Sequence, residues 1–267
     1  MKKIDLKMLG ITALVTGSVL AGSTTSFAGG GAQTDGTYDS KTVVKFQAPG
    51  EGGGEVDPVE PVDPTDPTKP VDPKDPPGEG TPGPLSIDFA SNLKFGTPEI
   101  SSKNQTYKVQ PQKFNNRVPE DGPNYVQVTD NRGTLKGWKL TLTQMGQLKT
   151  EDGNELTGAA INFENGHVAS TVDEEFRPSG NQEFTLQLGE DGKGVAENIM
   201  VADAGKGAGT FLHVFGGNDS AADSITLTVP GKTIKHADKD YSTKLKWTLS
   251  DVPSGNEGEE SGSEGEE

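Results

Sequence analysis

The chain has 267 residues, of which 30% are hydrophobic, and it contains 36 Gly, 18 Pro and no Cys. That length allows one domain of ordinary size with appendages, and the lack of Cys excludes disulfides, thiol catalysis and thiolate metal sites. The formal net charge of −16 argues against a nucleic-acid partner, because phosphate binding requires clustered Lys and Arg.

The negative charge is concentrated in two segments. Residues 50–84 carry nine acids against two Lys, a net −7, and residues 254–267 carry six Glu and no base. The first 28 residues carry +2, which leaves −5 for the remainder of the chain. The acidity therefore describes the appendages, and the globular part is only mildly acidic.

Residues 1–28 are predicted to be a secretory signal peptide. Lys2, Lys3 and Lys7 form a basic start, residues 8–20 form an apolar run, and residues 26–28 read small-x-small, as a cleavage site does. The apolar run is short and interrupted, so a retained membrane anchor is the less favoured alternative. No second hydrophobic stretch follows, and we expect no membrane span after cleavage. The mature protein is expected to be soluble or held outside the cell by non-covalent contacts.

Residues 29–49 form an N-terminal segment that contains TYDSKTVVKFQ. The stretch from Thr42 to Gln47 predicts a short strand. Because a lone strand is not stable in water, we expect it to pair with the domain that follows the linker.

Residues 50–84 form an acidic, Pro-rich linker. From Pro58 to Pro76 a proline recurs at every third position, and the residue before it is Asp or Glu in six of seven cases. Polyproline II has three residues per turn, so this repeat places prolines on one edge and mostly carboxylates on another. At about 3.1 Å per residue the repeat would span about 60 Å. We expect a stiff, solvated spacer looped out of the domain, and a docking site for a partner or cation is the alternative.

Residues 85–253 predict an all-β domain, a β-sandwich of short antiparallel strands, with the Pro-rich linker inserted after the first strand of the fold. Turn signals separate many short, alternating runs, a pattern typical of sandwiches and barrels. Asn165-Gly166 predicts a tight hairpin between two of these runs. The candidate strands are residues 85–89, 105–112, 125–129, 138–144, 160–163, 167–172, 183–188, 196–201, 209–215, 224–229 and 244–249. Residues 254–267 are expected to be a disordered acidic tail.

Signals for enzymatic activity are poor. The three His residues are scattered, and no HExxH, GxSxG or P-loop motif is present. The Asp-rich loops lack the ligand spacing of a calcium loop. We therefore expect no catalysis, no cofactor and no metal site. A hydrolase that uses two distant carboxylates is the remaining, weakest alternative.

Two stretches of the domain repeat a W-x-L pattern, GWKLTLTQ at residues 137–144 and YSTKLKWTLSDVP at residues 241–253. Strict alternation in both predicts half-buried strands. One face carries Trp138, Leu140, Leu142, Leu245, Trp247 and Leu249, and the other carries Lys139, Thr141, Thr143, Lys244, Lys246 and Thr248.

Three interpretations of these motifs stay open. In the first interpretation both tryptophans are core residues, because they are in phase with leucines, which normally face inward. Alternatively, they form an exposed patch that binds sugar faces or a protein. In the third interpretation the tryptophans are buried, the two strands adjoin, and their Lys/Thr faces form a ribbon that meets anionic wall polymers or a partner.

The chain resembles the WxL family of Gram-positive cell-surface proteins. The resemblance rests on the two W-x-L motifs, on the longer pattern Y-x-x-x-L-x-W-x-L-x-x-x-P from Tyr241 to Pro253, and on the linker. Lys246 stands where a common family form has Thr, and fourteen residues follow Pro253.

This resemblance implies a secreted protein held non-covalently on the cell wall, through peptidoglycan or another wall polymer and through surface proteins encoded alongside it. It does not imply an enzyme. The alternative is a structural component of a surface complex, or an adhesin for host ligands, in which the motifs are mainly core. The expected wall- or partner-binding residues are Trp138, Lys139, Leu140, Tyr241, Lys244, Lys246, Trp247 and Leu249.

Overall fold

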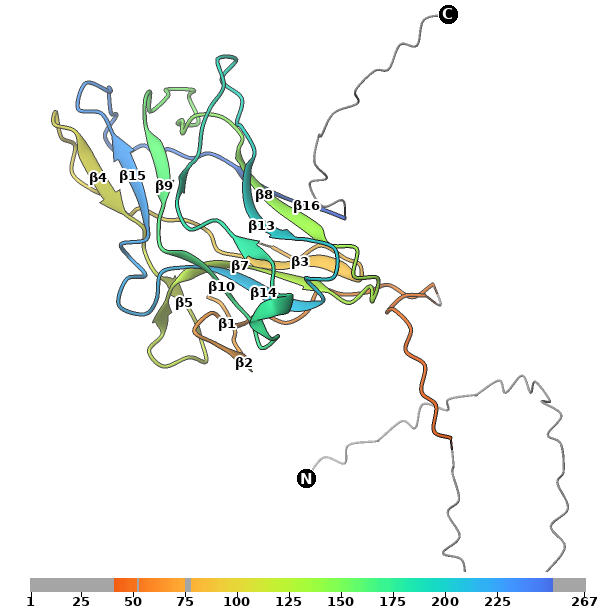
Figure 1. Cartoon of the computed structure of the whole chain (residues 1–267). Coiled ribbons are helices and arrows are strands. Elements are labelled where there is room, and N and C mark those ends of the chain that lie inside the picture. Colours follow the sequence, from red (N-terminus) through yellow and green to blue (C-terminus); the bar gives the residue numbers. More distant parts are fainter. Residues whose placement is uncertain (1–40, 52, 75–77, 252–267) are drawn as a thin grey trace, which may run out of the picture. The chain divides into compact units, whose positions relative to one another are not determined.

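The computed structural model describes residues 41–51, 53–74 and 78–251 (Figure 1). The chain divides into two compact units, residues 1–44 and 45–267. Only residues 41–44 of the first unit are described, and they are exposed. The predicted signal peptide, residues 1–28, and the predicted acidic tail, residues 254–267, lie outside the described residues.

The regular secondary structure of the second unit consists almost entirely of antiparallel strands, which confirms the predicted all-β class (Figure 1). The β7 sheet has the strand order β10 (Gly166–Ala169), β14 (Gly209–Phe215), β7 (Asn124–Asp130), β3 (Leu85–Ala90). The β8 sheet has the order β11 (Ser179–Gly180), β13 (Glu197–Ala202), β8 (Trp138–Gln144), β16 (Leu245–Ser250). The β9 sheet has the order β12 (Phe184–Thr185), β9 (Ala160–Phe163), β15 (Ile225–Val229), β4 (Gln105–Lys108).

Smaller elements complete the unit. β1 (Val62–Asp63) pairs with β2 (Asp66–Pro70), and β5 (Gln112–Lys113) pairs with β6 (Asp121–Gly122). One turn of 3-10 helix, η1, spans Glu174–Phe176. Within the described ranges, no helix is long and apolar enough to cross a membrane.

The three large sheets enclose one hydrophobic core. Val126 and Val128 of β7, Trp138 and Leu140 of β8, and Ile161 of β9 all belong to it. Side chains that alternate along each strand meet there because successive residues point to opposite faces of a sheet. All seven residues of β7 are buried, including those that point away from this core. Both faces of β7 must therefore be covered.

The second face of the β7 sheet is covered by the Pro-rich segment. Tyr125, Leu212 and Val214 point to this side and form a separate cluster with Phe114 and Val71. Val71 comes from the linker, as do the buried residues Asp63, Pro64 and Pro73. The segment is therefore packed on the domain from about residue 56 to residue 74, and the prediction of a solvated spacer looped out of the domain is wrong for this stretch.

Side chains of β3 and β7 bind the backbone of the linker. The amide of Gln127 accepts a hydrogen bond from the N–H of Val62 at 2.9 Å and donates to the carbonyl of Glu60 at 3.1 Å. The N–H of Val59 donates to Asp88 Oδ1 at 3.1 Å. Both Gln127 and Asp88 are buried. These contacts give linker backbone groups the partners that buried polar groups require.

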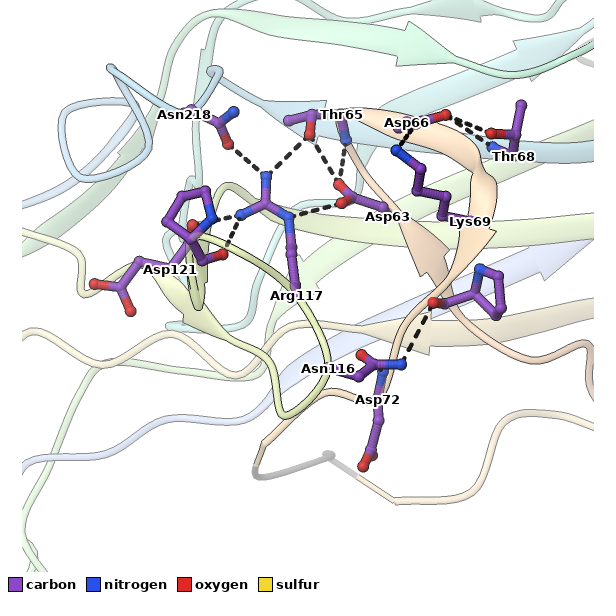
Figure 2. A network of polar contacts seen from close by, with 12 residues as sticks. Asp63, Thr65, Asp66, Thr68, Lys69, Asp72, Asn116, Arg117, Asp121 and Asn218 are labelled. Carbon is purple, nitrogen blue, oxygen red and sulfur yellow. Dashed lines mark hydrogen bonds and ion pairs between the residues drawn. The ribbon is translucent and has the colours of Figure 1, made fainter.

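A buried ion pair fixes the turn between β1 and β2. Arg117 Nε donates to Asp63 Oδ2 at 2.8 Å, and Arg117 Nη2 donates to both Thr65 Oγ1 and Asn218 Oδ1. Figure 2 shows the guanidinium between the linker and the loop that carries Asn218. The Arg117 and Asp63 side chains are only 4% and 10% exposed. Removing one partner of such a pair typically costs about 3–5 kcal/mol because the other charge stays buried.

The predicted N-terminal strand is absent from the structure. Residues 41–47 carry no β-pairing, and Val43, Val44 and Phe46 are 73%, 72% and 86% exposed. Alternating residues form a strand only where a neighbouring strand accepts their backbone hydrogen bonds, and within the described ranges no strand pairs with residues 41–47.

The predicted hairpin at Asn165-Gly166 is also wrong. β9 and β10 flank this dipeptide but lie in different sheets, where β9 pairs with β12 and β15 and β10 pairs with β14. Asn165 has the expected positive φ of 56°. Gly166 serves close packing, since a Cβ there would lie 2.3 Å from the carbonyl oxygen of Asn181. The dipeptide therefore connects β9 in the β9 sheet to β10 in the β7 sheet.

Candidate functional site

The two W-x-L motifs lie side by side in the β8 sheet. β8 and β16 are antiparallel neighbours, with Trp247 opposite Leu142 and Leu249 opposite Leu140. Directly opposite residues of an antiparallel pair point to the same face. The apolar residues of both motifs therefore face the core together, and the Lys and Thr residues of both strands face the other way.

The first motif is part of the core. Trp138 and Leu140 are both 0% exposed. Trp138 Nε1 donates a hydrogen bond to the carbonyl of Gly207 at 2.8 Å, and its ring lies 6.1 Å from that of Phe211. Gly207 has a left-handed φ of 80°, and a Cβ there would approach Trp138 Nε1 to 2.6 Å. This tryptophan is sealed on every side and cannot contact a ligand directly.

The second motif lies at a sheet edge. β16 is the last strand of the β8 sheet, and in the described part of the chain no strand pairs with its outer side. Trp247 and Leu249 are partly buried and pack on the main core. The approach to β16 is fixed by two backbone hydrogen bonds of 3.0 Å between Lys149 and Ser242. Tyr241 precedes it, and its hydroxyl accepts a hydrogen bond from the N–H of His236 at 3.0 Å.

The outward side of these strands forms a polar surface that we call the outer Lys/Thr face. Opposite positions pair Lys246 with Thr143 and Thr248 with Thr141. Lys244 and Lys246 are exposed, and Lys139 is partly exposed. Among the described residues, none of these three lysines forms an ion pair with an acid. The face consists of Lys139, Thr141, Thr143, Lys244, Lys246 and Thr248.

A groove of about 1120 Å³ opens beside β16. Its lining includes Leu245 and Trp247 of β16 and Tyr107 of β4, which is the edge strand of the β9 sheet. Leu93 and Phe95 also line it, from an extended stretch after β3 that belongs to no strand. The groove is therefore bordered by residues of two sheet edges and has a largely apolar lining.

Sequence reasoning missed this groove, although a signal was present. In the stretch LKFG, Leu93 and Phe95 alternate with exposed residues as in a strand. On another side of the groove, Lys235 links two loops, because its Nζ donates to the carbonyls of Ser101 and Thr233 at 3.1 and 2.9 Å. A lysine that bridges two loops in this way leaves no pattern in the sequence.

Comparison with known proteins identifies the family. The model of the family described as WxL domain surface cell wall-binding matches residues 33–253. The chain belongs to the WxL family. No curated protein and no solved structure matches it. The family is one of surface proteins that bind the cell wall and is not an enzyme family, so this WxL protein is associated with the cell surface and its wall.

The residues expected to bind the wall or a partner fall into three groups in this WxL domain. Trp138 and Leu140 are core residues. Tyr241, Trp247 and Leu249 are partly buried, and the first two of them line the groove. Lys139, Lys244 and Lys246 belong to the outer Lys/Thr face. The structure thus buries the tryptophan of the first motif, which both the first and the third interpretation expect, whereas the second motif lies between core and surface.

Proposed function

We propose that this WxL domain holds a secreted protein on the Gram-positive wall through contacts of its outer Lys/Thr face with peptidoglycan or another anionic wall polymer. The observation that carries the proposal is the register of β8 and β16, which gathers the lysines and threonines of both motifs on one face. The attachment is non-covalent, and the proposal includes no catalytic step and no cofactor.

The chemistry of this face suits a repeating anionic polymer. Ammonium groups attract carboxylates and phosphates, and threonine hydroxyls both donate and accept hydrogen bonds, as sugar hydroxyls require. Each exposed ionic contact contributes only about 0.2–1 kcal/mol. Useful retention therefore depends on several contacts along one polymer and on many domains along one wall. Such binding should weaken as salt increases, because exposed charges are screened.

The test is co-sedimentation of the mature protein, residues 29–267, with purified peptidoglycan free of protein. The informative variant is Lys139→Gln with Lys246→Gln. Its matched control is Lys103→Gln with Lys232→Gln, which removes the same charge from exposed residues outside the face. Circular dichroism confirms that each variant is folded.

We expect the first variant to lose most of its binding and the control to keep it. Equal binding by both variants would move the wall site elsewhere on the domain. If the wild-type protein fails to sediment with the wall, the proposal of direct attachment is overturned, and a surface protein encoded alongside becomes the anchor.

A further inference from the structure

The outer side of β16 carries backbone groups that nothing in the described chain binds. The N–H of Met145 donates to the carbonyl of Lys244 at 2.8 Å, and this pair continues the register of β8 and β16. Hydrogen-bonded pairs alternate along an antiparallel ladder, so Leu245, Trp247 and Leu249 direct their N–H and C=O groups away from β8. Within the described ranges, no hydrogen bond reaches these outward groups.

A free edge of this kind accepts another strand, and the side chains of the edge decide which strand fits. Lys244 and Lys246 disfavour any pairing that places a positive charge directly opposite them. Antiparallel pairing of β16 with β16 of a second copy avoids this when Trp247 lies opposite Trp247. Lys246 then lies opposite Thr248, and Lys244 lies opposite Ser250. Each lysine therefore has a hydroxyl group as its neighbour.

The backbone and the apolar side chains favour the same register. Leu245 lies opposite Leu249 of the second copy and Trp247 opposite Trp247, so every outward-directed residue joins a hydrogen-bonded pair. A shift of the second strand by two residues places Lys246 opposite Lys246, and the reverse shift places Leu245 opposite Asp251. The apolar side chains of both strands point to the side of the groove, because Leu245 and Trp247 line it.

We propose that this protein forms a dimer in which the free edges of two β16 strands pair antiparallel about a twofold axis at Trp247. The two β8 sheets then become one sheet, with both outer Lys/Thr faces on the same side of it. The pairing covers an edge that would otherwise invite aggregation, and because it is isologous it stops at two copies. For wall binding, a consequence that rests on the proposed function, the dimer offers one polymer twice the ammonium groups of Lys139, Lys244 and Lys246.

Single cysteines test the register, because the chain has none of its own. Lys246 and Thr248 of the second copy form a non-hydrogen-bonded pair, whose Cα atoms lie about 4.5 Å apart, within the range of a disulfide. Lys246→Cys protein is therefore mixed with Thr248→Cys protein that carries a mass tag, and oxidation is followed on non-reducing gels. Each variant alone is the control, because in this register two copies of one position lie about 7–8 Å apart.

We expect the mixture to form a disulfide-linked heterodimer at least about tenfold faster than either variant alone forms a homodimer. Fastest reaction of Lys246→Cys alone, or of Thr248→Cys alone, would show a register shifted by two residues. Similar slow rates in all three samples would show that the edge is free. Each of these results overturns the proposal.

Charge variants test the same pairing without a cross-link. Thr248→Glu places a carboxylate opposite Lys246 of the second copy and should tighten the dimer, whereas Thr248→Lys places like charges there and should weaken it. A dimer contains two such pairs, so each change should shift its dissociation constant by about two- to thirtyfold. The matched controls are Thr141→Glu and Thr141→Lys, directly beside Thr248 on β8 but away from the second copy. They should leave the dissociation constant nearly unchanged.

Sedimentation velocity of residues 29–267 at increasing protein concentration measures the dimer. A protein that stays monomeric at every concentration overturns the proposal, and so do equal shifts from the Thr141 and Thr248 variants. A dimer that none of these variants affects would show that another surface joins the copies, which also overturns it. None of the samples contains wall polymer, so failure of the dimer is distinguishable from failure of wall attachment.

Discussion

The two W-x-L motifs lie on neighbouring strands of one sheet, but their tryptophans have different surroundings. Trp138 is on β8, which has β13 on one side and β16 on the other, and the Gly207 loop closes over its indole nitrogen. Trp247 is on β16, which has a neighbour on one side only, and it lines an open groove. The place of the strand in the sheet, and not the motif, decides whether the tryptophan is sealed or accessible.

This difference also separates what the two motifs can do. A sealed tryptophan stabilises the fold and positions the lysine and threonines that alternate with it. A tryptophan at a groove can contact whatever occupies the groove. We therefore expect changes at the first motif to act on stability and changes at the second to act on accessibility.

The largest expected effect is the loss of the sealed side chain. Trp138→Ala should lower the free energy of unfolding by about 3–5 kcal/mol, the usual cost of emptying a buried tryptophan site. Trp247→Ala should cost about 1–3 kcal/mol, because only part of its surface is buried. Urea unfolding followed by circular dichroism measures both. Equal losses would show that the edge tryptophan is as much a core residue as Trp138.

The stability of the hydrophobic core should also depend on pH, through the buried side chain of His213. His213 lies on β14, two residues after Phe211, and is fully buried. Burial lowers its pKa from 6.5 to about 4, the nearby His167 contributes a further small lowering, and neither ring nitrogen has a hydrogen-bond partner among the described residues. The folded state thus binds its proton less readily than the unfolded state does.

Stability linked to His213 is fully present above about pH 6.5 and is lost as the pH falls toward 4, by about 3 kcal/mol in total. Unfolding free energies measured between pH 7 and pH 4 should therefore fall more steeply for the wild type than for His213→Leu. Parallel curves would show that His213 does not titrate in this range.

Two nearby glycines, Gly205 and Gly207, provide a test of how the loop encloses Trp138. Gly205 and Gly207 both have positive φ, 89° and 80°, so alanine is strained at either position. A Cβ at Gly205 would meet nothing within 4 Å, whereas one at Gly207 would clash with Trp138 and Ala202. Gly207→Ala should therefore cost about 1–3 kcal/mol more than Gly205→Ala. Near-ultraviolet circular dichroism should change for Gly207→Ala alone, and equal effects of the two would contradict the sealed loop.

Local alternation was enough to predict the strands of the domain but not their partners. Residues 138–144 and 209–215 form strands with the predicted bounds. The alternation predicts one strand over residues 105–112, but the stretch is divided between β4 and β5. Pro111, which has no N–H to donate to a ladder, lies in the break. Pairing depends on the whole fold, which is why the Asn-Gly dipeptide at residues 165–166 does not close a hairpin between β9 and β10.

In the Pro-rich linker the sequence pattern predicts least about which residues are buried. The triplets predict one edge of prolines and one of carboxylates, but the third position is apolar in three triplets, at Val59, Val62 and Val71. Val71 is buried in the second cluster. The triplet pattern predicts a solvated charge at Asp63, but its carboxylate is paired with Arg117, a residue 54 positions away. The valines were a visible signal, whereas the ion pair could not be foreseen without the fold.

The smallest expected effect on stability lies one residue from Trp247. Lys246→Gln should change the free energy of unfolding by less than about 0.5 kcal/mol, because an exposed side chain with no ion pair contributes little to folding. Urea unfolding beside Trp247→Ala tests adjacent positions that point to opposite faces of β16. A loss above about 1 kcal/mol for Lys246→Gln would mean that this lysine supports the fold. A reduced wall affinity with unchanged stability would instead assign the two faces of the strand to separate tasks, the inner one to folding and the outer one to attachment.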